Sequence, residues 1–530
     1  MKRRDFLKAS AIGGTAAAMA GMYVRRASAV PLFGDVPDQH ASLMLPKANQ
    51  ATSILECFLY GGLAPWESFY GVPEFGSEAA RTWHKAYPID LVNAVTACGY
   101  DSGNMFTPFA NDSSGRPIFF GPYVTPLLAR PDVTDRLRVV VNRHTLEPHE
   151  AAIPLALAGK PLGSPTLASL GTHVAAYQVA HDVENQHPAP FAYGLSSAGS
   201  FVNTDNILTM VASGQHPGAA RPLHIKVDNV ARLSQLLGRT QIGSLDDRAR
   251  YDALLQAYFA QYTDRLKFGG SGPQLRAPRF GELTAAGSSV AHAADIRGMI
   301  SDDYLSVVPG NSCLAKGDAK QDGTGPTPPI SGSLVHAALN GPYMCLRLAT
   351  HLLTHPQFPA AHCCMIDLGL VKADGGGGYD THSETPFTQS SNLFNFLNSL
   401  LPMINAPGET DPNKLDLNKT MIIINMEFGR APGLQKAYPL TGRNHWPYGY
   451  TQIYIGGPIT HAQRGIYGTI PESGQASTFT TPTENRIAAL LAMGIYPFGQ
   501  LSFSGSDVQG QTLEGPAIQS VTKRVLGYDV

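Results

Sequence analysis

The sequence predicts an α/β protein with a doubly wound, mostly parallel sheet, and two observations support this fold class. Short apolar runs of strand length recur along the chain, at residues 54–60, 137–141, 363–370, 421–426 and 452–455. Short, mostly apolar runs of this kind are typical of strands that are buried on both faces, as in a parallel sheet. Helical apolar patterns lie between some of the runs, at residues 245–266, 334–353 and 392–404. Alternation of strands with helices is typical of doubly wound proteins.

The N-terminus has the features of a twin-arginine (Tat) export signal. Arg3 and Arg4 precede Phe6-Leu7-Lys8, a weakly apolar run occupies residues 9–24, and Ala27-Ser28-Ala29 resembles a cleavage site. The run is shorter than the roughly 20 residues that a membrane-spanning helix needs. We therefore expect residues 1–29 to be a signal peptide. The Tat translocase is the expected partner during export, and the mature chain is expected to be periplasmic or secreted, without a membrane span.

Length and composition limit the domain organisation and the partners. Residues 30–530 are expected to form a single large α/β domain, because this length supports one sizeable core. Glycine and proline cluster within residues 269–333, which predicts loops or an inserted cap. A net charge of −2, with only 15% charged residues and no lysine or arginine cluster, argues against nucleic acid as a partner. A small anionic or glycan-type molecule is the expected ligand.

The six cysteines show no Cys-x-x-Cys spacing, which argues against a zinc ribbon, an iron–sulfur site and a c-type haem. Cys57, Cys363 and Cys364 lie within the apolar runs, which predicts buried free thiols. Disulfide pairing stays open.

Polar turns follow most of the predicted strands. In open α/β sheets the functional crevice lies at the carboxyl ends of the strands, so these turns are the expected site. In chain order they hold Glu67 and Ser68, then Arg143 and His149, then Asp380, Thr381 and His382, then Glu427 and Arg430, and finally His445 just before the last run.

Some of these residues have the character of a divalent-metal site. Carboxylate oxygens and neutral imidazoles both bind zinc and manganese. In the segment Asp380-x-His382, alternate residues share a face if the segment is extended, so both side chains can reach one ion. Arg143 and Arg430 fit two interpretations, a fork that binds an anionic substrate or a partner for a buried carboxylate.

The same segments carry a resemblance to a known family. The motifs are Gly-Gly-Tyr-Asp380-Thr381-His382, Glu427-Phe428-Gly429-Arg430 and Gly442-Arg443-x-His445-Trp446-Pro447. Together they resemble the Tat-exported domain-of-unknown-function 1501 family, which is similar to the alkaline phosphatase and sulfatase superfamily. The resemblance implies a three-layer, alkaline phosphatase-like fold. It also implies one ligand set for a divalent ion, whether zinc, manganese or calcium: Asp380, His382, Glu427 and His445, with Glu67 as a further candidate.

The chain departs from the family pattern at three points. Asn444 stands where members often carry an Asp, and Glu67-Ser68 stands where many have Asp-Thr. The position that holds the nucleophile in the sulfatase pattern falls on His149. Ser68 or Thr381 could therefore serve as the nucleophile, or metal-bound water could attack directly. Alternatively, the chain does not hydrolyse esters at all.

Two functions are compatible with these residues. The first is an exported metal-dependent hydrolase that acts on a phosphate or sulfate ester, with a catalytic set drawn from Ser68, Arg143, His149, Thr381 and Arg430. The alternative is a non-catalytic envelope or surface protein that keeps the hydrolase fold and binds a ligand. Metal content distinguishes the two most directly.

Overall fold

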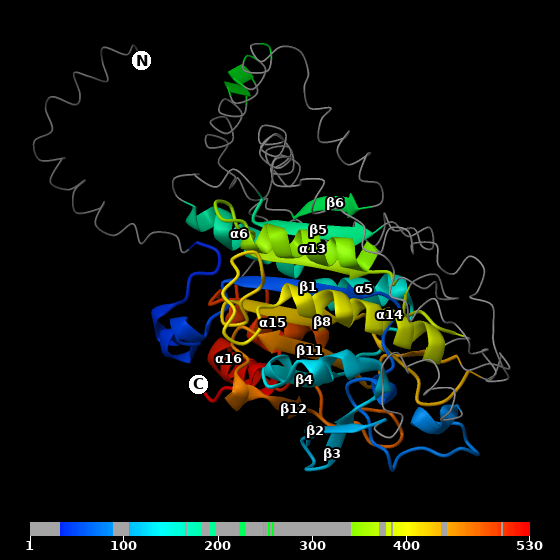
Figure 1. Cartoon of the computed structure of the whole chain (residues 1–530). Helices are drawn as coiled ribbons and strands as arrows, with labels where there is room; N and C mark the ends of the chain where they lie inside the picture. The colour runs from blue at the N-terminus through cyan, green and yellow to red at the C-terminus, as the bar shows by residue number, and fades with distance from the viewer. Residues whose placement is uncertain are drawn as a thin grey trace, which may run out of the picture.

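The fold is taken from a computed structural model of the chain (Figure 1). The structure describes residues 32–87, 105–164, 167–182, 190–197, 216, 222–227, 247, 250, 253–254, 257–258, 341–369, 378–382, 385–435, 442–499 and 502–530. The expected signal peptide, the stretch 269–333 and most of the helix predicted at residues 245–266 lie outside these ranges.

Eight strands of the described residues form one central sheet, in the order β12-β4-β11-β8-β1-β7-β5-β6. All of them run in the same direction except β11, which is antiparallel to both of its neighbours. The sheet is therefore mixed but mostly parallel. The strands are β1 (Ser53–Leu59), β4 (Leu137–Asn142), β5 (Ala192–Ser197), β6 (Leu223–Val227), β7 (His362–Asp367), β8 (Thr420–Asn425), β11 (Tyr450–Gly456) and β12 (Gly465–Tyr467).

The five predicted strands are all present, but the prediction that the fifth is parallel is wrong. Residues 452–455 belong to β11, which runs against β4 and β8. Between β8 and β11 the described chain makes only a small two-stranded sheet, β9 (Gly429–Arg430) with β10 (His445–Trp446). A helical crossover is what brings a chain back parallel, and an apolar run by itself does not encode direction.

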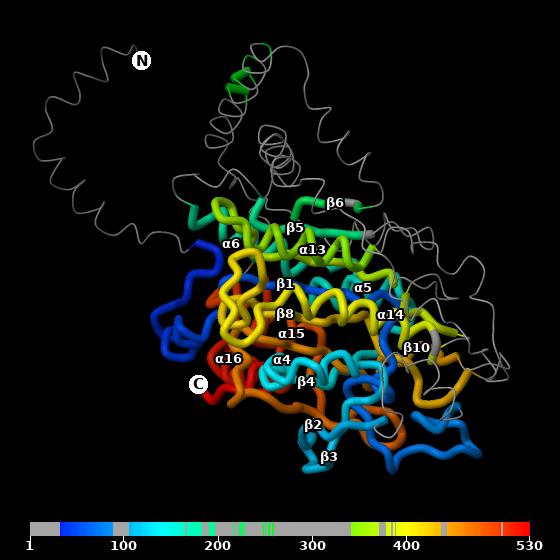
Figure 2. Tube along the Cα trace, in the orientation of Figure 1, coloured from blue at the N-terminus to red at the C-terminus, as the bar shows by residue number. Residues whose placement is uncertain are grey.

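Helices cover both faces of the sheet. Alternate residues of β1 point to opposite sides, so Leu55 and Cys57 pack in one core while Ile54 and Phe58 pack in others. Helices α13 (Gly341–Thr354) and α14 (Thr385–Leu400) lie on the Leu55 side, and Figure 2 shows them in front of the sheet. The opposite side is covered by α5 (His149–Ala158), α6 (Leu170–His181), α15 (Pro482–Ala492) and α16 (Glu514–Val521).

Smaller elements complete the described fold. They are the hairpin of β2 (Thr107–Asn111) with β3 (Pro117–Phe120), and the short helix α4 (Pro131–Thr134). Cys57, Cys345, Cys363 and Cys364 are buried free thiols, as predicted for three of them. Within the described residues, no helix combines the length and the apolar character needed to cross a membrane.

Candidate metal centre

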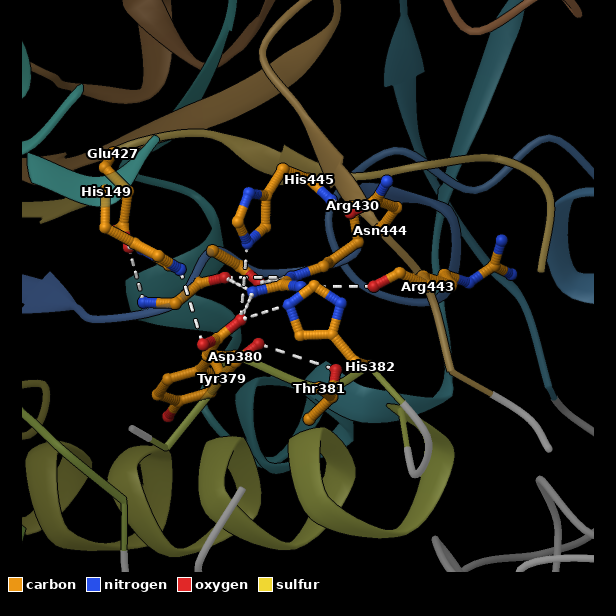
Figure 3. A network of polar contacts seen from close by, with 12 residues as sticks. His149, Tyr379, Asp380, Thr381, His382, Glu427, Arg430, Arg443, Asn444 and His445 are labelled. Carbon is orange, nitrogen blue, oxygen red and sulfur yellow. Dashed lines mark hydrogen bonds and ion pairs between the residues drawn. The ribbon is translucent and has the colours of Figure 1, made fainter. Parts of the chain in front are cut away.

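The strand register brings the carboxyl ends of the predicted strands β1, β7 and β8 to one edge of the sheet. Leu59 of β1 pairs with Asp367 of β7, and Phe58 pairs with Asn425 of β8, so these three strands end at the same level. Strand β4 runs in the same direction, because both β4 and β8 are antiparallel to β11. The turns that follow β1, β4, β7 and β8 therefore open onto one edge, where Figure 3 shows a polar network.

Asp380 is the centre of that network and is almost completely buried. Three imidazoles point their Nε2 atoms at its carboxylate (Figure 3). His149 Nε2 lies 3.3 Å from Oδ2, whereas His382 Nε2 and His445 Nε2 lie 3.0 and 3.5 Å from Oδ1. The Arg430 guanidinium also contacts Oδ1, at 2.5 Å. One carboxylate thus contacts three imidazoles and one guanidinium, which come from four separate segments of the chain.

A subset of this network has the geometry of an ion site. His149, Asp380 and His445 each offer one ligand atom, and these atoms all lie within 4.8 Å of one another. The two imidazole nitrogens, Nε2 of His149 and Nε2 of His445, are buried, and each faces the Asp380 carboxylate, at 3.3 and 3.5 Å, without a hydrogen bond of standard geometry. Other buried polar atoms of the described residues also lack a hydrogen bond, among them Glu67 Oε2 and Glu427 Oε2, so the feature that marks this site is the convergence of two imidazole nitrogens on one carboxylate.

Local structure fixes the direction of the two rings. His149 is the first residue of α5, and its ring stacks on Tyr60 with 5.1 Å between centroids. His445 lies in β10, opposite Arg430 of β9, and its ring stacks on Phe428 at 4.5 Å. Both rings are therefore held by packing on an aromatic neighbour as well as by the backbone.

Charge at the centre is unevenly distributed. Burial alone would raise the pKa of Asp380, but the Arg430 guanidinium and the three imidazoles hold it far below its usual range. Burial lowers the pKa of His149, yet the carboxylates of Asp380 and Glu427 outweigh burial and raise it to about 9. Burial also lowers the pKa of His445, and the opposing effect of Asp380 is too small to reverse this, so the pKa stays below its usual value. Asp380 is therefore a carboxylate at neutral pH, and an ion bound at His149 Nε2 must displace a proton.

Arg430 is completely buried and serves the framework of the site. Its guanidinium donates to the carbonyl oxygens of Gly61, Gly62 and Arg443 as well as to Asp380. Of the two interpretations from sequence, pairing with a buried carboxylate is the one that the geometry matches. A side chain with no exposed surface is not available to a substrate.

Arg143 is engaged at a different place. Its Nη1 donates to the carbonyl oxygen of Ala476 at 3.0 Å, and its guanidinium lies 5.2 Å from the centre of the Phe479 ring.

Glu67 ends the short 3-10 helix η3 (Pro65–Glu67) after β1 and Ser68 follows it, and both side chains are buried and bonded. Glu67 Oε1 accepts a hydrogen bond from Arg443 Nη2 at 2.6 Å, and Ser68 Oγ donates to the carbonyl oxygen of Ala64 at the same distance. Arg443 also donates through its backbone N–H to the carbonyl oxygen of Thr381. The pair of Glu67 and Arg443 therefore anchors the turn that carries His445, rather than adding a ligand to the Asp380 cluster.

Thr381 directs its hydroxyl towards α14. The oxygen lies 3.0 Å from the hydroxyl of Thr385 and accepts from Gln389 Nε2 at 3.1 Å. The Gln389 amide also donates to the carbonyl oxygens of Gly62 and Tyr379. Thr381 thus belongs to the scaffold that holds the Asp380 turn, and its hydroxyl is buried.

The sequence predicted Glu67, Asp380, His382, Glu427 and His445 as metal ligands and His149 as a catalytic residue. His149 was singled out because it stood at the expected nucleophile position, and the structure brings it to Asp380 with His445. Glu427 is not among the atoms that approach one another in that group, and neither is His382, although His382 contacts Asp380. The sequence feature that pointed to His149 was its position, because it begins the helix that follows the end of a strand.

Residues 371–497 match the family model described as "Protein of unknown function (DUF1501)". This match supports the resemblance that the sequence motifs indicated. It includes Asp380, His382, Glu427, Arg430 and His445, and it begins after His149. The comparison with curated proteins gave no match.

Proposed function

We propose that the protein is a metal-dependent hydrolase with one divalent ion held by His149, Asp380 and His445. One observation carries the proposal: two buried imidazole nitrogens converge on one buried carboxylate, with the three ligand atoms within 4.8 Å of one another. Two imidazoles with one carboxylate form a donor set that suits zinc or manganese, whereas calcium prefers oxygen ligands alone. Three protein ligands leave coordination positions open, which is typical of catalytic rather than structural zinc sites.

The proposed reaction is hydrolysis of a phosphate or sulfate ester. A bound ion would polarise the ester and lower the pKa of a water molecule at the open position. The hydroxyls of Ser68 and Thr381 are buried and already bonded, so water is the nucleophile that this arrangement favours. Among the chain's own groups, we assign proton movement to His382. Its ring is partly exposed, and Gln435 Oε1 lies 2.8 Å from its Nδ1.

A second candidate function is a ligand-binding protein that keeps the fold and the ion but performs no turnover. The state of the two arginines favours it. Arg430 is buried and saturated, and Arg143 is engaged with Ala476 and Phe479, so neither is set to hold an anionic ester.

Activity measurements on the purified mature chain separate the two candidates. We expect hydrolysis of p-nitrophenyl phosphate or p-nitrophenyl sulfate that requires added zinc or manganese and stops with a chelator. Asp380→Asn should abolish it, whereas Asp416→Asn, at a partly exposed turn before β8, should not. Binding of an ion without turnover of either ester would contradict the hydrolase proposal and favour the binding protein.

Export through the Tat pathway remains part of the proposal and has its own test. Arg3→Lys combined with Arg4→Lys should leave the precursor in the cytoplasm, because the pathway requires the arginine pair. Normal amounts of mature protein in the periplasm of the double variant would show that the signal is not of the Tat type.

A further inference from the structure

Glu427 follows β8 and has a completely buried side chain next to the proposed ion site. Its Oε1 atom accepts two hydrogen bonds, one from the backbone N–H of Gly61 at 2.7 Å and one from His149 Nδ1 at 2.8 Å. The group of ligand atoms that approach one another consists of His149, Asp380 and His445, and it does not include Glu427. Through Oε1 this carboxylate therefore contacts a proposed ligand from behind, while its Oε2 atom is buried and makes no hydrogen bond.

The contact to Nδ1 determines whether the other ring nitrogen, Nε2, has a lone pair available for an ion. Glu427 Oε1 already accepts from the backbone N–H of Gly61, and a carboxylate oxygen is an acceptor, so we assign the hydrogen of this bond to Nδ1. In the neutral imidazole, the lone pair is then on Nε2, which faces Asp380 Oδ2 at 3.3 Å. A carboxylate behind a histidine in this way fixes both the tautomer and the ring orientation of a metal ligand.

The position of Glu427 is itself fixed by the neighbouring loop. Its backbone carbonyl lies 2.7 Å from His144 Nε2, while the Nδ1 of His144 accepts from the backbone N–H of Leu146 at 3.1 Å. His144 therefore carries its hydrogen on Nε2 and donates it to Glu427. The segment between β4 and α5 is thus tied to the end of β8 twice, once through His144 and once through His149.

We propose that Glu427 is a positioning residue that orients His149 from outside the coordination shell of the ion. The proposal rests on the proposed metal site. It replaces the role of direct ligand that the family resemblance implied for Glu427. It also links α5 to the end of β8, because the ligand strength of His149 then depends on a residue that follows β8.

Cobalt titration of the mature chain tests this role, since the visible absorption of bound Co²⁺ reports its ligand set. We expect Glu427→Gln to bind Co²⁺ with the same bands as the wild type, because no ligand is lost. Its affinity should fall about 10- to 100-fold, the usual effect of removing an outer partner of a ligating histidine. Glu427→Ala should bind at least as weakly as Glu427→Gln, and Asp380→Asn should lose the spectrum.

Each other outcome has a distinct meaning. If Glu427→Gln shifts or weakens the bands as a ligand loss does, Glu427 is a direct ligand and the inference is wrong. If both Glu427 variants bind with wild-type affinity, Glu427 has no positioning role. If the wild type binds no Co²⁺, the proposed metal site fails and the inference falls with it. Circular dichroism identifies a variant that does not fold, and Glu427→Gln, which keeps the shape of the side chain, then carries the test.

Discussion

Two buried carboxylates in this protein have the same kinds of partners but different surroundings. Asp380 contacts Arg430 and histidines at the strand-end edge, whereas Glu56, in the middle of β1, contacts Arg486 and His362. The side chain of His362 is only 2% exposed, while those of the histidines around Asp380 are 15% to 22% exposed. Residue types alone therefore do not distinguish a structural ion pair from a candidate site.

The Glu56 cluster serves the core. Glu56 Oε1 accepts from Asn425 Nδ2 at 2.9 Å and from Arg486, and His362 Nε2 lies 3.3 Å from Oε2. These contacts join β1, β7, β8 and α15 in the interior. The two clusters differ in where they lie in the fold. A residue within a central strand contacts only neighbouring strands and helices, while a residue beyond a strand end can face a ligand.

The largest expected effect is on stability, and it falls on Glu56. Glu56→Gln should lower the free energy of unfolding by about 3–5 kcal/mol, because it leaves a buried Arg486 without its carboxylate. Asp380→Asn should cost less, since Arg430 keeps carbonyl acceptors in Gly61, Gly62 and Arg443. Urea denaturation of both variants measures this. Equal losses would contradict the distinction between the two clusters.

The second largest expected effect is on zinc affinity and concerns the Asp380 cluster. His149→Ala should weaken binding by more than about 100-fold, beyond the effect of an outer-shell change. His362→Asn is the matched control from the Glu56 cluster and should bind zinc like the wild type. Isothermal titration of chelator-treated protein compares them, and a similar loss in both variants would remove His149 from the ligand set.

The third expected effect is a pH dependence of stability. Burial would raise the pKa of Glu56, but Arg486 and His362 lower it to about 2 from its usual 4.5. Because the folded pKa lies below the unfolded one, this stabilisation is complete above pH 4.5 and is lost as the pH falls towards 2. Melting temperatures from pH 6 to pH 3 should therefore fall less steeply in Glu56→Gln than in the wild type. Parallel curves would show that Glu56 does not contribute.

The smallest expected effect is at the edge of the Asp380 cluster. Gln435 lies 2.8 Å from His382 Nδ1, and His382 contacts Asp380 without belonging to the tight ligand group. Gln435→Leu should lower zinc affinity by less than about tenfold, the scale of one lost hydrogen bond of about 1 kcal/mol. A loss as large as that of His149→Ala would place His382 among the ligands.

The sequence predicted strands well where most of their residues are apolar. Strands β1, β7 and β8 are buried along their whole length, and their apolar runs contain few polar residues, such as Glu56 in β1. Strands β5 and β6 contain glycine, serine, histidine and lysine, and they were not predicted. The direction of β11 was also missed, because it depends on the connection rather than on the composition of the strand.

For the candidate site, the sequence predicted where the residues lie better than what each side chain contacts. Strand-end position brought Asp380, His149 and His445 to attention. The pairing of Glu67 with Arg443 depends on packing between distant segments, and spacing does not encode it. Likewise, whether an imidazole or a carboxylate faces the centre is decided by differences of an ångström in side-chain placement.

Ion stoichiometry tests the central claim most directly. The mature wild-type chain, stripped with a chelator and titrated with zinc or manganese, should bind one ion per chain at micromolar concentration and gain thermal stability. Asp380→Asn should bind none. If the wild type shows no saturable binding and its melting temperature does not respond to the chelator, the Asp380 cluster is a structural hydrogen-bond network and not a metal centre.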